Sequence, residues 1–430
     1  MTSTSGAAGI LAGLDGIRDD LEEFYRDLHA HPELGLAERR TASRVAERLR
    51  EWGYRVTDGI GGTGVVGVLA NGDGPTVLLR ADMDALPVRE DTGLPYASTV
   101  TTTDADGAEL PVMHACGHDT HVTCMLGFAR LMAASPQAWR GTLTVLFQPS
   151  EENGDGADAM VDDGLVERIP RPDVALAQHV LPYPAGYVGV RPGSFLAAAD
   201  SLRITLYGRG GHGSMPQFTV DPVVLAALCV VRLQTVVSRE LAPTAPAVLT
   251  VGSIQAGASP NVIPDSAVIL LNVRTYDETT RRQVLDAVER CVRAEATASN
   301  APKEPSIERI TSFPATVNDA EAAERLAKAF AAHFGDDAGT IELQTASEDF
   351  SQIPRAFDVP FAYWGFGGAD PEKYAEAVRN DTVTQDIPVN HSPHFAPVLQ
   401  PTLDTGVAAL TVAALEWLGA GTESPGGGRG

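Results

Sequence analysis

The stretch His114–Gly154 reads HACGHDTHVTCMLGFARLMAASPQAWRGTLTVLFQPSEENG, and it combines a fold signal with a chemical one. Its middle predicts a helix over 120–133, and 141–147 is a continuous apolar run that is typical of a buried strand. Similar runs predict strands elsewhere, with amphipathic helices as the alternating elements. The other predicted strands lie at 64–69, 76–79 and 173–180, and the other helices at 17–28 and 36–52. This alternation predicts an α/β domain with a mainly parallel sheet.

The pattern changes near Ser194, where half-exposed alternating strands replace the buried ones. The next elements follow the order strand, helix, strand, strand, helix, strand, which describes a small ferredoxin-like unit. They lie at 201–207, 221–241, 247–255, 266–275, 277–297 and 306–313, and a helix at 319–333 resumes the α/β pattern. The sequence therefore predicts one discontinuous domain, 1–195 and 313–420, interrupted by a module at 196–312. The Gly- and Pro-rich end, 421–430, is expected to be disordered.

The composition is that of a globular protein with a strong acidic balance. The 430 residues are 44% hydrophobic and 20% charged, with a formal net charge of −24. This charge repels phosphates, so we expect no nucleic acid or membrane partner. We expect no apolar run to reach the roughly 18 residues of a membrane helix, and the first residues lack a signal-peptide pattern. Four cysteines without a disulfide framework fit a reducing cytosol, so a cytoplasmic protein is expected.

Cysteine and histidine alternate between His114 and His121, immediately before the predicted helix. Cys116 and His118 stand two residues apart, so that both can face one centre, and thiolate and imidazole suit a borderline-soft divalent metal. The plainer interpretation is a helix start capped by Asp119, with the cysteine as a small core residue. This interpretation does not explain why three of the ten histidines of the chain fall within eight residues.

An acidic pair, Glu151 and Glu152, follows the predicted strand that ends at Phe147. Sites in open α/β sheets lie at the carboxyl ends of strands. One carboxylate there can bind metal while the other remains a general base, although a solvated acidic loop fits equally well. Asp82 and Asp84 follow another strand and project to the same side if the chain stays extended, as metal ligands or as groups that orient ligands.

Two further places carry histidines whose signal is weak when each is taken alone. His179 stands at the end of a predicted strand, where a satisfied core histidine is the commoner interpretation. His391 and His394 stand in a loop-like HSPHF string, and either of them is a candidate ligand.

Taken together, these motifs resemble the aminoacylase/carboxypeptidase-G family of metallopeptidases, and within it the branch of hippurate hydrolases and indole-acetyl-amino-acid hydrolases. Matching strings occur in family order over nearly the whole chain. They lie at 29–35, 80–87, 113–121, 147–156, 179–180, 208–216, 261–264, 347–350 and 391–393. The resemblance implies a zinc-peptidase-like catalytic domain with an inserted ferredoxin-like lid and dimerisation domain.

The resemblance also implies two divalent ions per subunit, of zinc, manganese, cobalt or nickel. Five ligands are implied for them, namely Cys116, His118, Glu152, His179 and His391. Cys116 would take the bridging place that an aspartate fills elsewhere in the family. Glu151 would be the general base and Asp84 the acidic residue that supports the metal site. Asp82 stands where other branches carry a metal-binding histidine and is left outside the ligand set.

Further implied roles fall in the inserted module. His212, in the string GRGGHGSMP, matches a lid histidine that reaches the active site of the partner subunit in a homodimer and polarises the scissile carbonyl. Asn261 and Arg274 match residues that hold the α-carboxylate of the substrate, a task that suits bidentate arginine. The alternative interpretation of Arg274 is a surface charge on a strand that has no role in substrate binding. Gln217 departs from many relatives, which have histidine there, and this bears on substrate preference.

The expected reaction is metal-dependent hydrolysis of the amide bond of an N-acyl amino acid, with an N-acetyl, N-benzoyl or similar acyl group. A dipeptidase or a diaminopimelate deacylase on the same scaffold is an alternative that acyl-group profiling would separate. A thiol enzyme with Cys116 as nucleophile would survive removal of metal. A non-catalytic binding protein is the third alternative, and the complete set of ligand types argues against it.

Overall fold

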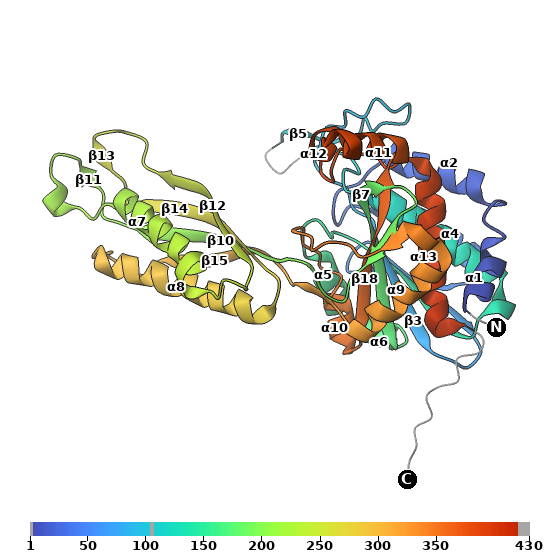
Figure 1. Cartoon of the computed structure of the whole chain (residues 1–430). Helices are drawn as coiled ribbons and strands as arrows, with labels where there is room; N and C mark the ends of the chain where they lie inside the picture. Colours follow the sequence, from blue (N-terminus) through green and yellow to red (C-terminus); the bar gives the residue numbers. More distant parts are fainter. Residues whose placement is uncertain (1–2, 104–106, 420–430) are drawn as a thin grey trace, which may run out of the picture. The chain divides into compact units, whose positions relative to one another are not determined.

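The computed structural model describes residues 3–103 and 107–419, which fall into two compact units (Figure 1). The larger unit combines the chain up to Gly193 with Asn318–Glu342 and the part from Asp349 onward. The smaller unit combines Ser194–Val317 with Leu343–Glu348. The division into a catalytic domain and a lid stays a prediction, and the tail 421–430 lies outside the described residues.

The larger unit is built on an eight-stranded, mainly parallel sheet, which confirms the predicted α/β class. In sheet order its strands are β1 (Arg55–Ile60), β2 (Gly64–Asn71), β6 (Gly141–Gln148), β3 (Thr76–Asp82), β7 (Val174–Pro184), β18 (Phe361–Ala369), β8 (Val188–Val190) and β17 (Ala338–Gly339). The four strands β6, β3, β7 and β18 are parallel neighbours. Nearly every residue of β3 and β6 is buried, so both faces of the sheet are covered there.

The larger unit also contains helices of very different lengths. They are α1 (Ser3–Leu11), α2 (Arg18–His29), α3 (Arg39–Glu51), α4 (His118–Ala134), α5 (Gly156–Asp162), α6 (Leu165–Arg168), α9 (Ala320–Phe334), α10 (Gln352–Phe357), α11 (Pro371–Asn380), α12 (Val383–Asp386) and α13 (Leu399–Leu418). Helices α4 and α13 are buried over most of their length and share one hydrophobic core with the central strands. Two short strands, β4 (Thr101–Thr103) and β5 (Glu109–Pro111), pair outside the main sheet.

The smaller unit has the predicted ferredoxin-like order. Its elements are β10 (Ala198–Tyr207), α7 (Pro222–Thr235), β12 (Ala247–Ala256), β14 (Ser266–Thr275), α8 (Glu278–Ala298) and β15 (Ser306–Phe313). The antiparallel sheet runs β12-β14-β10-β15, and both helices pack on it around a separate core. Two smaller sheets pair β11 (Gly211–His212) with β13 (Val262–Ile263) and β9 (Gly193–Leu196) with β16 (Thr316–Asn318).

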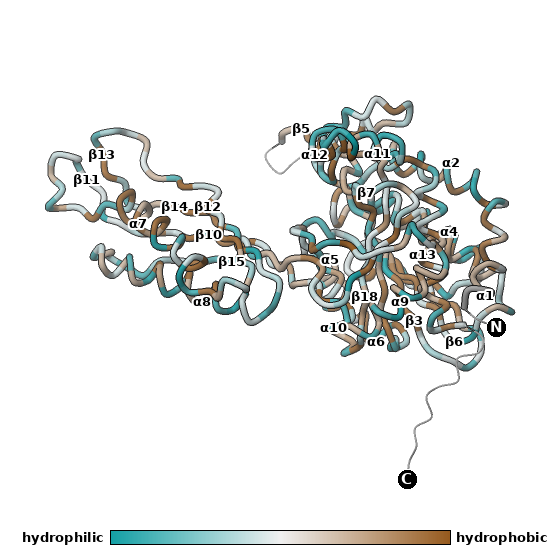
Figure 2. Tube along the Cα trace, viewed as in Figure 1, coloured by the Kyte–Doolittle hydropathy of each residue, from teal (hydrophilic) through white to brown (hydrophobic). Residues whose placement is uncertain are grey.

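One helical stretch, Pro222–Glu240, is long and apolar enough to cross a membrane by length and composition (Figure 2), although Arg232 and Arg239 interrupt its apolar residues. The finding is weak, because the core helix of a soluble protein passes the same test. One side of the helix, with Leu225, Cys229 and Leu233, is buried in the core of the smaller unit.

Helix α4 begins at His118, two residues earlier than predicted. Its N-cap is Gly117, whose φ of 80° suits glycine, so the interpretation of Asp119 as the cap is wrong. An added Cβ at Gly117 would lie 2.5 Å from a side-chain carbon of Val180. The tight turn therefore packs the Cys116–His118 segment closely against Val180 of β7.

Candidate active site

The fold brings the candidate residues of the larger unit together at one edge of the sheet. Strand β3 ends at Asp82, β6 ends just before the acidic pair, and β7 carries His179. These strands are parallel neighbours, so their carboxyl ends meet at the same edge. Cys116 and His118 come to the same place from the start of α4.

Ligand-type atoms of these residues form overlapping groups. Cys116, Glu152 and His391 have such atoms within 4.8 Å of one another, and so do His118, Glu151 and Glu152. His179 completes the set, because its Nε2 lies 3.5 Å from Sγ of Cys116. The structure thus gathers the five predicted ligands and the predicted base, whose roles stay predictions.

Two of the imidazoles are oriented by protein oxygens that contact their Nδ1 atoms. Nδ1 of His118 lies 3.1 Å from Oδ1 of Asp84, and Oδ2 of Asp84 accepts the backbone N–H of Glu152 at 2.9 Å. Nδ1 of His179 donates to the carbonyl of Val180 at 2.7 Å. In each ring Nε2 is left for the cluster, which is how proteins orient metal-binding histidines.

Some buried polar atoms at the centre of this residue cluster are arranged as a bound cation would require. Within the described part of the chain, neither Nε2 of His118 nor Oε1 of Glu152 has a hydrogen-bond partner, although both atoms are buried. One sulfur, three imidazole nitrogens and a carboxylate form a donor set that suits zinc or a related ion. The residues present therefore fit a bound metal.

The electrostatics of the cluster favour positive charge. Burial lowers the pKa of His118, but Asp82 and Asp84 raise it more, to about 10. Burial also raises the pKa of the Cys116 thiol well above its usual range, and carboxylates, Glu152 foremost, raise it further. Reactive thiolates need electropositive surroundings, so these neighbours argue against Cys116 as a free nucleophile.

The C-terminal loop supplies His391 to the cluster and directs His394 elsewhere. His391 has a φ of 70°, and its backbone N–H donates to the carbonyl of Ala115 at 2.8 Å. Its Nε2 lies 3.3 Å from Oε1 of Glu152. In contrast, Nδ1 of His394 contacts the carbonyl of Asp91 at 2.7 Å. Geometry therefore separates two histidines that their local sequence string, taken alone, left equal.

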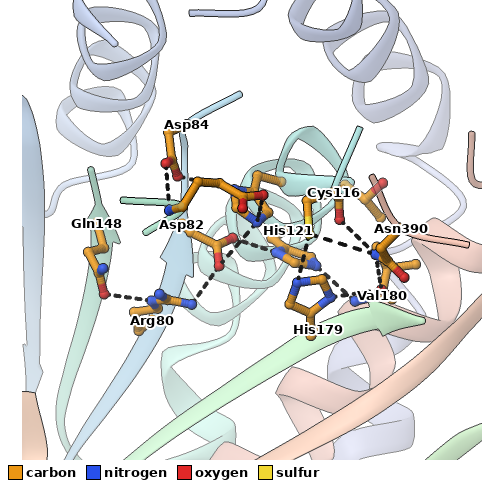
Figure 3. Close-up of polar contacts among 12 residues, drawn as sticks. Arg80, Asp82, Asp84, Cys116, His121, Gln148, His179, Val180 and Asn390 are labelled. Atoms are coloured by element: carbon orange, nitrogen blue, oxygen red, sulfur yellow. Dashed lines mark hydrogen bonds and ion pairs between the residues drawn. The ribbon is translucent and has the colours of Figure 1, made fainter. Parts of the chain in front are cut away.

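Sequence reasoning missed the role of Asn390. Its Nδ2 lies 3.2 Å from the carbonyl oxygens of Cys116 and Val180 and 3.8 Å from Sγ of Cys116 (Figure 3). The side-chain amide of Asn390 thus donates hydrogen bonds both to the turn before α4 and to β7. The only sequence signal was its place beside His391.

Comparison with known proteins identifies the family. Residues 78–389 match the model of peptidase family M20/M25/M40. The chain belongs to this family. The M20 chain is 38% identical to hippurate hydrolase of Campylobacter jejuni over 338 residues, which are 78% of this chain and 85% of the relative. It is 39% identical to N-acetyl-L-cysteine deacetylase of Bacillus subtilis over 273 residues, 63% of either chain.

A solved M20 structure supports the same assignment. The YXEP protein of Bacillus subtilis, described as a dinuclear metal-binding peptidase of the M20 family, superposes with a TM-score of 0.75 at 27% identity. The superposition covers 93% of this chain and 98% of that one. The resemblance to the amidohydrolase branch is confirmed, and the M20 chain is an enzyme of the hydrolase class.

The smaller unit of the M20 chain carries the remaining candidates in two separate places. His212 pairs with Val262 across β11 and β13, next to Asn261, whose carbonyl accepts the N–H of Gly213 at 2.8 Å. Nδ1 of His212 accepts the backbone N–H of Ser214 at 3.1 Å, and the ring is exposed.

Arg274 lies near the other end of β14 from this hairpin. It donates to the carbonyl of Thr345 at 2.6 Å and to Oγ of Ser347 at 3.2 Å. At about 3.3 Å per residue, the strand places Arg274 roughly 26 Å from Ser266, which follows β13 closely. One copy of the smaller unit therefore does not bring Asn261 and Arg274 together.

A buried ion cluster behind the M20 site predicts a pH dependence of stability. Nδ1 of His29 lies 2.6 Å from Asp119 and Nε2 lies 3.0 Å from Glu90, with all three side chains buried. Burial lowers the pKa of His29, but hydrogen bonds with Asp119 and Glu90 raise it more, from 6.5 to about 10. Because the folded pKa lies above the unfolded one, the stabilisation is complete below pH 6.5 and is lost as pH rises through 10.

His29→Gln should therefore lower the free energy of unfolding by about 3–5 kcal/mol at pH 6, because two buried carboxylates lose their cation. The difference from wild type should shrink as the pH approaches 10. Urea unfolding of both proteins across this range checks it, with the exposed neighbour changed in His31→Gln as the matched control. A difference that stays constant with pH would contradict a charged His29.

Proposed function

We propose that this M20 chain is a metal-dependent amidohydrolase that cleaves N-acyl amino acids into a carboxylic acid and a free amino acid. The observation that carries the proposal is the gathering of Cys116, His118, Glu152, His179 and His391 beside the buried Glu151. The names of the relatives, hippurate hydrolase and N-acetyl-L-cysteine deacetylase, point to amides of amino acids as the substrate class.

We infer a centre of two divalent ions, of zinc, manganese, cobalt or nickel, which Cys116, His118, Glu152, His179 and His391 would hold. The sulfur of Cys116 lies close to His179 and is also grouped with Glu152 and His391, which supports the proposal that this cysteine would be a ligand shared by the two ions. Bound divalent ions supply Lewis acidity and lower the pKa of water.

The four free cysteines fit a reducing, cytoplasmic location.

The carboxylate of Glu151 handles the proton in this proposal. It takes a proton from the attacking water and passes it to the nitrogen of the leaving amine. Glu151 is buried and lies within 4.8 Å of His118 and Glu152, so it is held beside the reacting atoms. His212 would donate a hydrogen bond to the developing oxyanion, and Asn261 and Arg274 would hold the α-carboxylate.

A homodimer through the smaller unit is part of the proposal. Helix α7 exposes Val223, Val224, Leu228 and Val231, the last of them 68% exposed. The edge strand β12 also exposes Val248 and Ile254. An apolar helix face and a free sheet edge are surfaces that proteins seldom leave open, and a second copy can cover both with two-fold symmetry.

The separation inside the smaller unit supports the same assembly. Asn261 and Arg274 lie near opposite ends of β14, so one substrate carboxylate meets both only if they come from different copies. We therefore propose that His212 and Asn261 of one copy act on the substrate of the partner, together with an Arg274 from a different copy.

A substrate panel tests the activity. We expect the metal-loaded enzyme to hydrolyse N-acetyl, N-benzoyl or longer N-acyl amino acids faster than dipeptides or acylated diaminopimelate. Dialysis against a chelator should abolish the activity, and zinc or manganese should restore it. Cys116→Ala should contain less metal than the wild type. Activity that survives chelation would point to a thiol enzyme, and a preference for dipeptides would contradict the proposed substrate class.

A further inference from the structure

A third group of ligand-type atoms lies beside the proposed metal centre. Asp82, His118, His121 and His179 place such atoms within 4.8 Å of one another, which by composition alone resembles a metal site. The hydrogen bonds of His121 assign it a different task. Nε2 of His121 accepts the backbone N–H of Val180 at 2.8 Å.

That bond indicates which tautomer the ring adopts. A backbone nitrogen can only donate, so Nε2 of His121 must carry a lone pair. The ring proton therefore sits on Nδ1, where it donates to Oδ1 of Asp82. Both nitrogens of His121 are engaged with protein atoms, and neither is left to bind a metal.

Asp82 is held just as firmly. Its Oδ2 accepts from Nη1 of Arg80 at 2.6 Å. The guanidinium is fully buried, and its Nε donates to Gln148 at 2.8 Å while Nη2 lies 3.4 Å from Asp349. A buried chain of hydrogen bonds thus runs from Gln148 of β6 through Arg80 and Asp82 to His121 and Val180 of β7 (Figure 3).

The ring of His121 contacts the rings of two proposed ligands, His118 and His179, whose own centroids lie 5.7 Å apart. It stacks on His118 with centroids 5.3 Å apart and planes at 29°, and it meets His179 edge-on with centroids 4.4 Å apart. Its bond to Val180 also fixes the residue that follows His179. A shift of this one ring would move both imidazoles.

We propose that His121 is a positioning residue, not a ligand, that sets the separation and ring planes of His118 and His179 through its locked pairing with Asp82. The inference rests on the proposed metal centre. It assigns the Asp82–His121 pair to the support of that centre and removes the group from the candidates for a further metal site.

The test compares His121→Phe with the wild type and with His333→Phe. Phenylalanine keeps an aromatic ring at His121 but removes both hydrogen bonds. His333 is a half-buried histidine on α9 that packs on Phe334, so its variant is a matched loss of one imidazole. Each protein is loaded with cobalt, and its stoichiometry at saturation, its affinity against a competing chelator and its visible absorption are measured.

For His121→Phe we expect the wild-type number of cobalt ions at saturation, about 10- to 100-fold weaker affinity and an altered absorption spectrum. kcat should fall with little change in KM, and His333→Phe should match the wild type. Fewer cobalt ions at saturation would make His121 a ligand and overturn the proposal. An unchanged affinity and spectrum would overturn it too. A wild type that binds no cobalt would refute the metal centre itself and, with it, this inference.

Because a substitution at a buried site can prevent folding, the wild type provides a second measurement. Its histidines are isotopically labelled, and NMR-active cadmium is bound. Scalar coupling to cadmium is expected for nitrogens of His118 and His179 and not for those of His121. Coupling to a nitrogen of His121 would overturn the proposal without any variant.

Discussion

Glu151→Gln is expected to lower kcat by about 10² to 10⁴-fold while the protein keeps its metal. Glutamine preserves the shape of the buried side chain but cannot take a proton from the attacking water. Glu152, in contrast, points Oε1 at His391 from 3.3 Å, and that buried oxygen lacks a hydrogen-bond partner among the described residues. Glu152→Gln should therefore lose metal as well as activity.

Steady-state kinetics and metal analysis of the two variants check this division of roles. The pair is closely matched, because the substitutions are identical and stand at adjacent positions. If Glu151→Gln loses metal while Glu152→Gln retains it, the roles of base and ligand are reversed.

His212→Ala is expected to keep its metal and to lose nearly all activity, and part of that activity should return on mixing with Glu151→Gln. In a mixed dimer, one site combines an intact Glu151 from one chain with an intact His212 from the other. Random exchange makes about half the dimers mixed, each with one working site, so roughly a quarter of wild-type activity should return.

A matched control distinguishes recovery through complementary active sites from recovery because mixing merely stabilises the variant chains. Cys116→Ala and Glu151→Gln both damage the site on their own chain, so their mixed dimers should stay inactive. Subunit exchange is followed with chains of different mass. If exchange is complete and His212→Ala still fails to recover, His212 acts within its own chain or not at all.

The layered fold could be predicted where each element keeps one simple pattern. Alternation in β10 and β14 and the continuous apolar run of β6 identified both units. The sequence pattern did not reveal β18 or α13. Strand β18 mixes aromatic residues with three glycines, and α13 is buried nearly all round, so it lacks the one-sided apolar stripe that marks a surface helix.

Residue types at the site could be predicted, but their orientations could not. The residues around Cys116 predicted a cluster of metal-ligand types. However, the orientation that brings His391 and not His394 to this cluster depends on a left-handed backbone conformation at His391. The role of His121 depends on Val180, which is distant in sequence and lies close to it only because β7 passes beside the start of α4. Such pairings arise from tertiary packing and leave little trace in local spacing.

Asp84 limits how this enzyme can be re-engineered. One oxygen of its carboxylate faces the imidazole of His118, and the other accepts the backbone N–H of Glu152. Asp84 therefore fixes the positions of three segments relative to one another. They are the end of β3, the start of α4 and the acidic loop after β6. A chimera that imports only one of these segments from a relative would misalign the other two, so the three are best transplanted as one block.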